Sequence, residues 1–267
     1  MTAQPICLSI AGLDPSGGAG IIADVRTFSA FGCFPAAVVT SITFQDTTGV
    51  FGSEHQTDVT VRRQTEPIFK DYSIAAMKTG MLPSKSIIKT AASIIESQKV
   101  EYLVVDPVVR STSGYDLIDD VALQSLVSLM FPLSTLITPN IPEAERIVGF
   151  DIRDRTDLER AAMKMRELGA RNILIKGGHV VDGLNSPGVA ADHLFMPDGL
   201  RVFEGEYFQT TATHGTGCVL SAAITAGLAL GSDLQNSIAA AKEFVSEAIR
   251  TAPNLGRGHS PINIRTI

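Results

Sequence analysis

The sequence lacks the features that mark nucleic-acid-binding and membrane proteins. Its 22 Lys and Arg residues are outnumbered by 28 Asp and Glu, which gives a net charge of −6, and no basic stripe is present. Affinity for a phosphate backbone needs clustered Lys and Arg, so we expect no nucleic-acid partner. The longest weakly polar stretch, residues 218–231, is shorter than the roughly 20 apolar residues that span a bilayer. We therefore expect no membrane partner either.

Cysteine is also scarce. The three cysteines, Cys7, Cys33 and Cys218, are odd in number and widely spaced, which argues against a disulfide framework and against a zinc site. No basic residue precedes the first apolar run, so the N-terminus does not resemble a secretion signal. These absences predict a cytoplasmic protein with reduced thiols.

What the sequence does contain is typical of one globular domain. Hydrophobic residues make up 45% of the 267 residues and charged residues 19%, which is enough for a full core. No linker, repeat or low-complexity tract interrupts the chain. We predict a single domain over residues 1–267.

Short apolar runs alternate with longer segments that have apolar residues at helical spacing. The runs are residues 6–11, 36–43, 75–78, 102–106, 136–138 and 172–176, and the helical segments include 84–98, 121–130, 158–168 and two that begin near 215 and 234. Strands that are apolar throughout and separated by helices indicate a parallel sheet covered on both faces. We predict a three-layer α/β/α fold around a central, mostly parallel sheet.

Two segments predict small antiparallel elements at the edges of this sheet. Residues 49–55 are typical of a short edge strand. Residues 193–196 and 201–208 flank Pro197-Asp198-Gly199, whose composition is that of a hairpin turn.

Polar side chains follow the apolar runs, at the points where the strands should end. In open parallel sheets, ligands bind at the carboxyl ends of the strands. The residues at these positions are Asp14, Gln45, Lys78, Asp106, Asn140, Glu143 and Lys176. We expect them to form a binding site.

The run Thr213-His214-Gly215-Thr216-Gly217-Cys218 opens an apolar, alanine-rich helical segment. Its two glycines and Thr216 would present successive backbone N–H groups at the positive helix end, an anion hole suited to a transferring phosphoryl group. Cys218 falls in the first helical turn, a position that lowers the pKa of a thiol. The alternative is an inert buried cysteine.

Two other segments are rich in glycine. Residues 14–20 follow the first strand, but the match of residues 18–23 to G-x-G-x-x-A is weak, and a simple packing turn is the alternative. In Lys176-Gly177-Gly178-His179 the lysine could reach phosphate oxygens, or it could be a solvated lysine before a turn. No G-x-x-x-x-G-K-[ST] occurs, which excludes a P-loop enzyme.

Several motifs follow one another in a fixed order, as far as about Ala252. They are residues 9–20, 23–24, 45–47, 78–82, 105–108, 138–144, 176–179 and 213–218. In this order they resemble the hydroxymethylpyrimidine/phosphomethylpyrimidine kinases of thiamine biosynthesis, in the ribokinase-like superfamily. The resemblance implies an ATP-dependent kinase that phosphorylates 4-amino-5-hydroxymethyl-2-methylpyrimidine and then its monophosphate. It also implies a homodimer.

On the substrate side, the resemblance assigns roles to four residues. Gln45 would bind the aminopyrimidine, and a primary amide suits this because it offers a donor and an acceptor side by side. Asp24 would assist from the first helix, Met81 would pack on the ring face, and Gly12 would line the same site. The alternatives are a loop-bonding residue for Gln45 and core filling for Met81.

On the nucleotide side, the resemblance implies ATP with Mg²⁺. Glu143 would act on the metal through waters, because Mg²⁺ dehydrates reluctantly, and Asp106 is a second candidate that could instead cap a helix. The nucleotide residues would be Asn140, Glu143, Lys176, Gly178 and Thr213.

The catalytic residues would be Lys176, Gly215, Thr216, Gly217 and Cys218. Many ribokinase-like enzymes have an aspartate base at the position of Cys218. Phosphoryl transfer passes through a loose transition state, so a thiolate of near-neutral pKa would suffice as the base.

The chain departs from the family pattern at Leu13, Phe44 and Asp46, and in the loop of residues 109–115. Phe44 beside Gln45 alters the expected size of the substrate pocket. Arg110 in the loop could clamp the phosphate of an already phosphorylated substrate, or it could face solvent.

Three other functions stay open at this point. A pyridoxal or pyridoxine kinase shares the fold and, in one branch, the cysteine. A nicotinamide-nucleotide hydrate dehydratase has a similar anion hole but typically carries aspartate in place of Cys218. A non-catalytic pyrimidine-binding module is disfavoured by the intact Lys176, Glu143 and Cys218.

Overall fold

A computed structural model describes residues 4–111, 114–178 and 188–265, and these residues form one nine-stranded sheet. The strand order is β3-β2-β1-β4-β5-β6-β7-β8-β9. Six neighbouring strands of the sheet run parallel, namely β2, β1, β4, β5, β6 and β7. The strands at the edges, β3 on one side and β8 and β9 on the other, pair antiparallel with their neighbours. The strands are Ile6–Leu13 (β1), Phe34–Asp46 (β2), Gly49–His55 (β3), Ile74–Thr79 (β4), Tyr102–Val105 (β5), Leu136–Ile137 (β6), Ile173–Ile175 (β7), Val189–Met196 (β8) and Gly199–Glu206 (β9).

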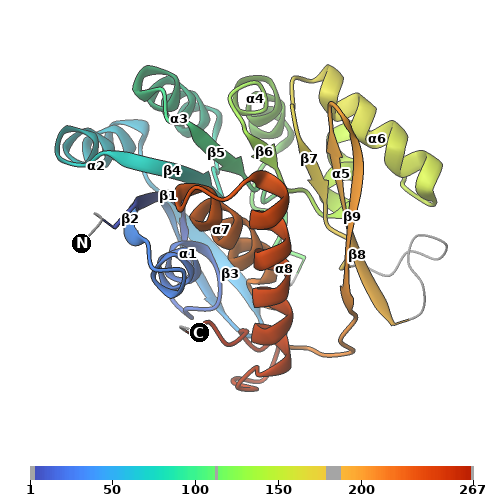
Figure 1. Ribbon diagram of the computed structural model, residues 1–267. Coiled ribbons are helices and arrows are strands. Elements are labelled where there is room, and N and C mark those ends of the chain that lie inside the picture. The colour runs from blue at the N-terminus through green and yellow to red at the C-terminus, as the bar shows by residue number, and fades with distance from the viewer. Residues whose placement is uncertain (1–3, 112–113, 179–187, 266–267) are drawn as a thin grey trace.

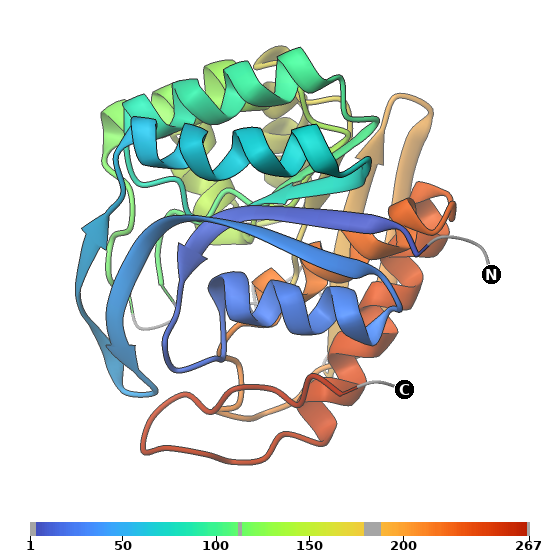
Figure 2. The same cartoon turned by 90° about the vertical axis from the view of Figure 1, so that its left-hand side faces the viewer.

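Helices cover both faces of this sheet, so the predicted three-layer fold is confirmed (Figures 1 and 2). One face carries α2 to α6, and the other carries α1, α7 and α8. The helices are Gly20–Ala30 (α1), Asp58–Asp71 (α2), Lys85–Gln98 (α3), Asp120–Met130 (α4), Ile141–Val148 (α5), Arg155–Glu167 (α6), Thr216–Ala229 (α7) and Leu234–Arg250 (α8). None of the helices in the described ranges is long and apolar enough to cross a membrane.

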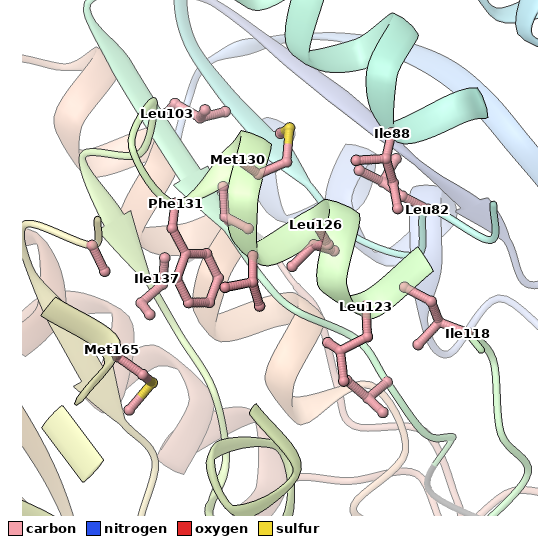
Figure 3. Packing of buried hydrophobic residues seen from close by; sticks show 14 of the residues in the cluster. Leu82, Ile88, Leu103, Ile118, Leu123, Leu126, Met130, Phe131, Ile137 and Met165 are labelled. Atoms are coloured by element: carbon pink, nitrogen blue, oxygen red, sulfur yellow. The ribbon is translucent and has the colours of Figure 1, made fainter. Parts of the chain in front are cut away.

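The core divides along the sheet because successive strand residues point to opposite faces. In β5, Leu103 and Val105 pack toward the α2–α6 layer, and Val104 between them packs toward α7 and α8. Figure 3 shows the first of these clusters, where Phe131 lies among side chains of the sheet and of the covering helices. Burial on both faces is the reason that these strands are apolar throughout.

The antiparallel elements lie where the sequence predicts them. Residues 49–55 form β3 at one edge of the sheet, and the hairpin of β8 and β9 turns at Pro197-Asp198 to form the other edge. The helices α2 and α5 were not among those that the pattern singled out. The first contains Pro67 and buries few residues, and the second has only 8 residues, fewer than the window of about 11–18 residues over which a helical period is recognised.

The topology determines where a ligand can bind. The chain runs from β1 to β2 on one side and returns to β4 on the other side of β1. A crevice forms at such a switch point, outside the carboxyl ends of the strands. The segments that follow β1, β2, β4, β5, β6 and β7 therefore meet at one edge.

Candidate active site

One pocket of about 900 Å³ lies at this edge of the sheet. Its wall combines segments from nearly the whole chain, including the start of α7. Of the residues predicted for the site, those that line it are Gly12, Gln45, Met81, Asp106, Asn140, Glu143, Lys176, Gly178, Thr213, Gly215, Thr216, Gly217 and Cys218. Two predicted residues, Asp24 and the strand-end residue Lys78, are not among the lining residues. His179 and the flap residues Thr112 and Ser113 lie outside the described ranges.

The anion hole is built by the first turn of α7. Gly215 is the N-cap residue with φ of 85°, and a Cβ there would lie 1.8 Å from the backbone oxygen of Gly18. Only glycine can take this conformation at such close approach. Within the described chain no side chain caps the helix. The Thr216 N–H donates to the carbonyl oxygen of Thr213 at 3.3 Å, so the N–H groups of Gly217 and Cys218 are the ones available to an anion.

Lys176 places a positive charge beside this helix start. Its Nζ lies 3.0 Å from Oδ1 of Asp106 and 3.8 Å from Oε2 of Glu143. A Cβ on Gly217 would lie 3.1 Å from the same Nζ, which shows that the ammonium group faces the anion hole. The lysine is therefore an ordered part of the site and not a solvated residue before a turn.

Asp106 is held as a buried carboxylate. Burial favours its neutral form, but the ammonium groups of Lys176 and Lys78 keep the pKa of Asp106 below its usual range. Thr138 and Ser221 donate hydrogen bonds to it at 3.1 and 3.3 Å. The helix that follows, α4, is capped by Asp119, so the alternative of a capping role for Asp106 is wrong.

Asn140 and Glu143 form the capping box of α5. Oδ1 of Asn140 accepts from the backbone N–H of Glu143, and Oε2 of Glu143 accepts from that of Asn140, both at 2.8 Å. Burial, only partly offset by Lys176, raises the pKa of Glu143 to about 7. The box fixes this carboxylate at the pocket wall, near Lys176.

The described residues contain no group of three or more His, Cys, Asp or Glu side chains that could hold a metal ion. Asp106 and Glu143, brought together by Lys176, are two carboxylates in one wall of the pocket. Mg²⁺ is usually bound by one or two carboxylates together with waters and substrate phosphates. Asp106 and Glu143 therefore fit Mg²⁺ better than a metal ion whose ligands must all come from the protein.

The predicted pyrimidine residues gather at the other side of the anion hole. Gln45 lies at a register shift near the end of β2, and its amide hydrogen-bonds the carboxylate of Asp14. A Cβ on Gly12 would lie 3.0 Å from Sδ of Met81, so this sulfur covers the end of β1. Gln45, Met81 and Gly12 thus line one end of the pocket.

Asp14 and His214 connect this end to the anion hole. Nε2 of His214 lies 2.7 Å from Oδ2 of Asp14, and both residues are buried. Although burial opposes it, the hydrogen bonds from His214, Gln45 and Ser16 lower the pKa of Asp14 to about 2. The sequence showed Asp14 as a strand-end residue and His214 within the glycine run, but no local signal pairs them.

Asp24 does not reach the pocket. Its side chain is fully buried, pairs with Nζ of Lys78 at 2.7 Å and accepts a hydrogen bond from Ser9 at 2.6 Å. The expected contact between Asp24 and the pyrimidine is therefore not what the fold provides. Lys78, another strand-end residue, is equally buried beneath the site.

Cys218 lies in the first turn of α7, as predicted, but its expected near-neutral pKa is wrong. Burial, reinforced by the carboxylates of Asp24 and Asp106, raises the pKa of this thiol to about 11. The ammonium group of Lys78 and a hydrogen bond from the Gly20 N–H oppose the shift but do not cancel it. The effect of desolvation on the thiol pKa is therefore larger than the opposite effect of the helix N-terminus.

The flap residue Arg110 also lines the pocket. It pairs with Asp116 through Nε at 2.9 Å, and Arg146 approaches the same carboxylate oxygen at 3.3 Å. Both partners in the Arg110–Asp116 pair are more than half exposed, so the pair contributes little to stability. Arg110 could therefore leave Asp116 and bind another anion with little loss of free energy.

The remaining end of the pocket was missed by sequence reasoning. Its walls come from β8, the segment after β9, and α8, with Lys242, Val245 and Ser246 among the lining residues. Asp192 holds Lys242 at 2.8 Å and accepts from the Gly177 N–H at 2.8 Å. The α8 residues belong to an ordinary amphipathic pattern, which gives no hint of a binding role.

The fold and the site together define a ribokinase-like small-molecule kinase, with an uncapped helix start, a lysine and two carboxylates at the switch point of a parallel sheet. The phosphomethylpyrimidine kinase family model matches residues 14–263, and the chain belongs to that family.

Similar proteins include two kinases of this family and one pyridoxal kinase. The hydroxymethylpyrimidine/phosphomethylpyrimidine kinase of Staphylococcus aureus is 39% identical, over 98% of this chain and 94% of its own. The crystal structure of a phosphomethylpyrimidine kinase from Clostridium difficile is 39% identical, covers 92% of this chain and 100% of its own, and gives a TM-score of 0.80. A Bacillus subtilis pyridoxal kinase, solved as an ADP complex, is 34% identical over 99% and 98% of the two chains, with a TM-score of 0.88.

Proposed function

We propose that the protein transfers the γ-phosphoryl group of ATP to the hydroxyl of 4-amino-5-hydroxymethyl-2-methylpyrimidine, and then a second one to the resulting monophosphate. The observation that carries this proposal is the position of Gln45 and Met81 at one end of a pocket whose centre is the anion hole with Lys176. The family membership of the chain supports the same activity. It also favours a kinase over a hydrate dehydratase.

The substrate end of the pocket is preorganised for an aminopyrimidine. Gln45 lies within hydrogen-bonding reach of the Asp14 carboxylate, and this contact would orient the remaining donor and acceptor sites of the amide. His214 fixes Asp14 in turn. An amide held in this way can pair with a ring nitrogen and the adjacent exocyclic amine.

At the centre of the pocket, the protein stabilises the phosphoryl group during its transfer. The N–H groups of the α7 start and the ammonium group of Lys176 converge on one place, where the charge on the equatorial oxygens would lie. Asp106 and Glu143 would hold Mg²⁺ through waters, and the ion would neutralise phosphate charge. Asn140, Gly178 and Thr213 would line the nucleotide.

A panel of substrates tests the proposal. With Mg-ATP we expect ADP release with the pyrimidine alcohol and its monophosphate, at a kcat/KM at least about tenfold above that for pyridoxal or pyridoxine. Gln45→Leu should lower kcat/KM for the pyrimidine by about 10- to 100-fold, since it removes hydrogen bonds to buried polar groups, and should leave KM for ATP unchanged.

The matched control is Gln124→Leu, at an exposed position of α4, which should have no effect. A preference for pyridoxal that Gln45→Leu does not alter would favour the alternative function, a pyridoxal kinase. The similar pyridoxal kinase of Bacillus subtilis is the observation behind that alternative. No ADP release with any of these compounds would point to a non-catalytic binding module.

Cys218 is the proposed proton acceptor, and its raised pKa makes the hypothesis testable by pH. Below a pKa of about 11 the thiolate fraction grows tenfold per pH unit, so kcat should rise in that proportion from about pH 7 to 9. Cys218→Ala should reduce kcat by about 10²–10⁴-fold and abolish the slope. Cys33→Ala, at a buried thiol away from the pocket, is the control. Near-wild-type turnover in Cys218→Ala would remove Cys218 from the chemistry.

Arg110 is proposed as a clamp for the phosphate of the monophosphate substrate. Arg110→Ala should raise KM for the monophosphate by about tenfold, which corresponds to the loss of one charge-assisted hydrogen bond, and should leave KM for the alcohol unchanged. Asp116→Asn, which frees Arg110 from its partner, should not raise KM for the monophosphate. An unchanged KM in Arg110→Ala would show that the side chain only faces solvent.

The homodimer, the cytoplasmic location and the single domain belong to the same proposal. The dimer is supported only by the family resemblance, and the location by the unpaired cysteines of the sequence. Analytical ultracentrifugation of the purified chain would test the dimer.

A further inference from the structure

The segment Leu255–Pro261, which we call the C-terminal strap, lies beyond the part of the chain to which the sequence motifs reach. After α8 it leaves the helical layer and runs along the end of the molecule that carries the site. Figure 2 shows this red segment crossing to the turn between β2 and β3. That turn follows Asp46, the neighbour of Gln45, at the substrate end of the pocket.

Thr47 binds the strap at this turn. Its Oγ1 accepts from the backbone N–H groups of Arg257 at 3.1 Å and Gly258 at 3.3 Å, and its carbonyl oxygen accepts from that of His259 at 2.7 Å. A Cβ on Gly256 would lie 2.1 Å from this Oγ1, so the contact leaves no room for a side chain. One residue of the turn thus accepts three backbone donors from a segment about 210 positions away.

The other end of the strap is bound to the anion-hole run. The backbone N–H of His214 donates to the carbonyl oxygen of Ser260 at 3.3 Å, and His214 forms a β-bridge with Pro261. Nδ1 of His259 lies 3.4 Å from Oγ1 of Thr213. The strap therefore touches the loop that begins α7 and the turn that follows Gln45.

From these contacts we infer that Thr47 is a positioning residue, which fixes the substrate amide of Gln45 relative to the anion hole through the C-terminal strap. The reacting hydroxyl must lie in line with the γ-phosphoryl group, and small displacements of bound groups cost large factors in rate. Two sites on separate loops keep such alignment only if something ties the loops together. The strap adds a second connection beside the Asp14–His214 pair, and its residues are not among those that line the pocket. The inference rests on the proposed function for the identity of the substrate.

Thr47→Val and Thr47→Ser test this role. Valine keeps the shape of the side chain but removes the acceptor, and should raise KM for the pyrimidine alcohol and lower kcat, together a loss of about 10- to 100-fold in kcat/KM. KM for ATP should change less than about twofold, because Thr47 binds at the substrate end of the pocket. Serine keeps the acceptor and should restore kcat/KM to within about threefold of the wild-type value.

Thr48→Val is the matched control. Thr48 lies in the same turn, but its Oγ1 bonds Asp46 and not the strap, so its loss should leave both KM values near wild type. His259→Ala should act in the same direction as Thr47→Val. The double variant should be little worse than Thr47→Val alone, because both changes break one connection. Melting temperatures of all variants would show whether each protein is folded.

Three results would overturn the inference: equal increases in both KM values for Thr47→Val, no rescue by Thr47→Ser, or equal losses in Thr47→Val and Thr48→Val. These outcomes differ from failure of the proposed function, which would appear as a wild-type protein that does not phosphorylate the pyrimidine. If the wild-type protein phosphorylates pyridoxal instead, the same variants measured on pyridoxal test Thr47 independently.

Discussion

Lys176→Met is expected to lower kcat/KM for ATP by about 10²–10³-fold, the cost typical of removing one preorganised group that stabilises transition-state charge. The ammonium group lies beside the start of α7, where the transferring phosphoryl group would be bound. Loss of this charge also leaves Asp106 and Glu143 facing each other across the pocket wall. The pKa of both carboxyls should then rise, which weakens any cation site that they form.

Steady-state kinetics with varied ATP, at saturating pyrimidine, measures this effect. The control is Lys164→Met, since Lys164 makes an exposed ion pair with Glu167 on α6, does not line the pocket and should behave as wild type. A melting temperature for each variant separates loss of catalysis from loss of fold. A kcat/KM for Lys176→Met within about threefold of wild type would show that the lysine has no part in transfer.

Lys78→Met is expected to lower the free energy of unfolding by about 3–5 kcal/mol, the usual cost of removing one partner from a buried ion pair. Lys78 and Asp24 have fully buried side chains and lie 2.7 Å apart beneath the anion hole. Without the ammonium group, the Asp24 carboxylate keeps, among the described residues, the hydrogen bond from Ser9. Burial already raises the pKa of Asp24, and loss of Lys78 should raise it further.

Urea denaturation measures this loss, and its pH dependence has a definite sign. A carboxyl whose folded pKa is raised contributes stability at low pH that is lost as the pH rises through that pKa. The deficit of Lys78→Met relative to wild type should therefore be smaller at acidic pH than at neutral pH. The double variant Lys78→Met/Asp24→Asn should recover much of the lost stability, because no unpaired charge stays buried.

The control for Lys78 is an ion pair at the surface. Arg155→Met removes a partner from the exposed pair Arg155–Glu159 and should cost less than about 1 kcal/mol. If Lys78→Met had the same urea midpoint as Arg155→Met, the buried pair would contribute nothing to stability and Asp24 would have to be solvated in the variant.

Local patterns in the sequence were enough to predict most of the fold. The apolar runs predicted the strands because a strand buried on both faces has no polar side, and β5 and β7 show this directly. The same patterns predicted where Asp106 and Lys176 lie, since a residue after a parallel strand must lie at the carboxyl edge of the sheet. The glycines at the start of α7 were recognised from the local sequence, because they stand directly before an apolar helical segment.

The errors concern burial and charge. The sequence places Cys218 in a first helical turn, which lowers a thiol pKa, but it does not show that the half-buried side chain lies near Asp24 and Asp106, where its pKa is raised. Asp24 was expected at the substrate, and the fold instead places it beneath the pocket with Lys78. A pKa and a solvent contact depend on what surrounds a residue in space.

The helix start at Gly215 to Cys218 and the strand-end residues around it were determined by the sequence alone, because each follows from the conformation of a few adjacent residues. Only the tertiary structure decided that His214 pairs with Asp14, 200 residues away, and that Thr47 binds Arg257, 210 residues away. Such contacts arise when the packed layers bring distant loops to one edge of the sheet. They leave no periodic signal in the chain, and they connect the substrate end of the pocket to its anion hole.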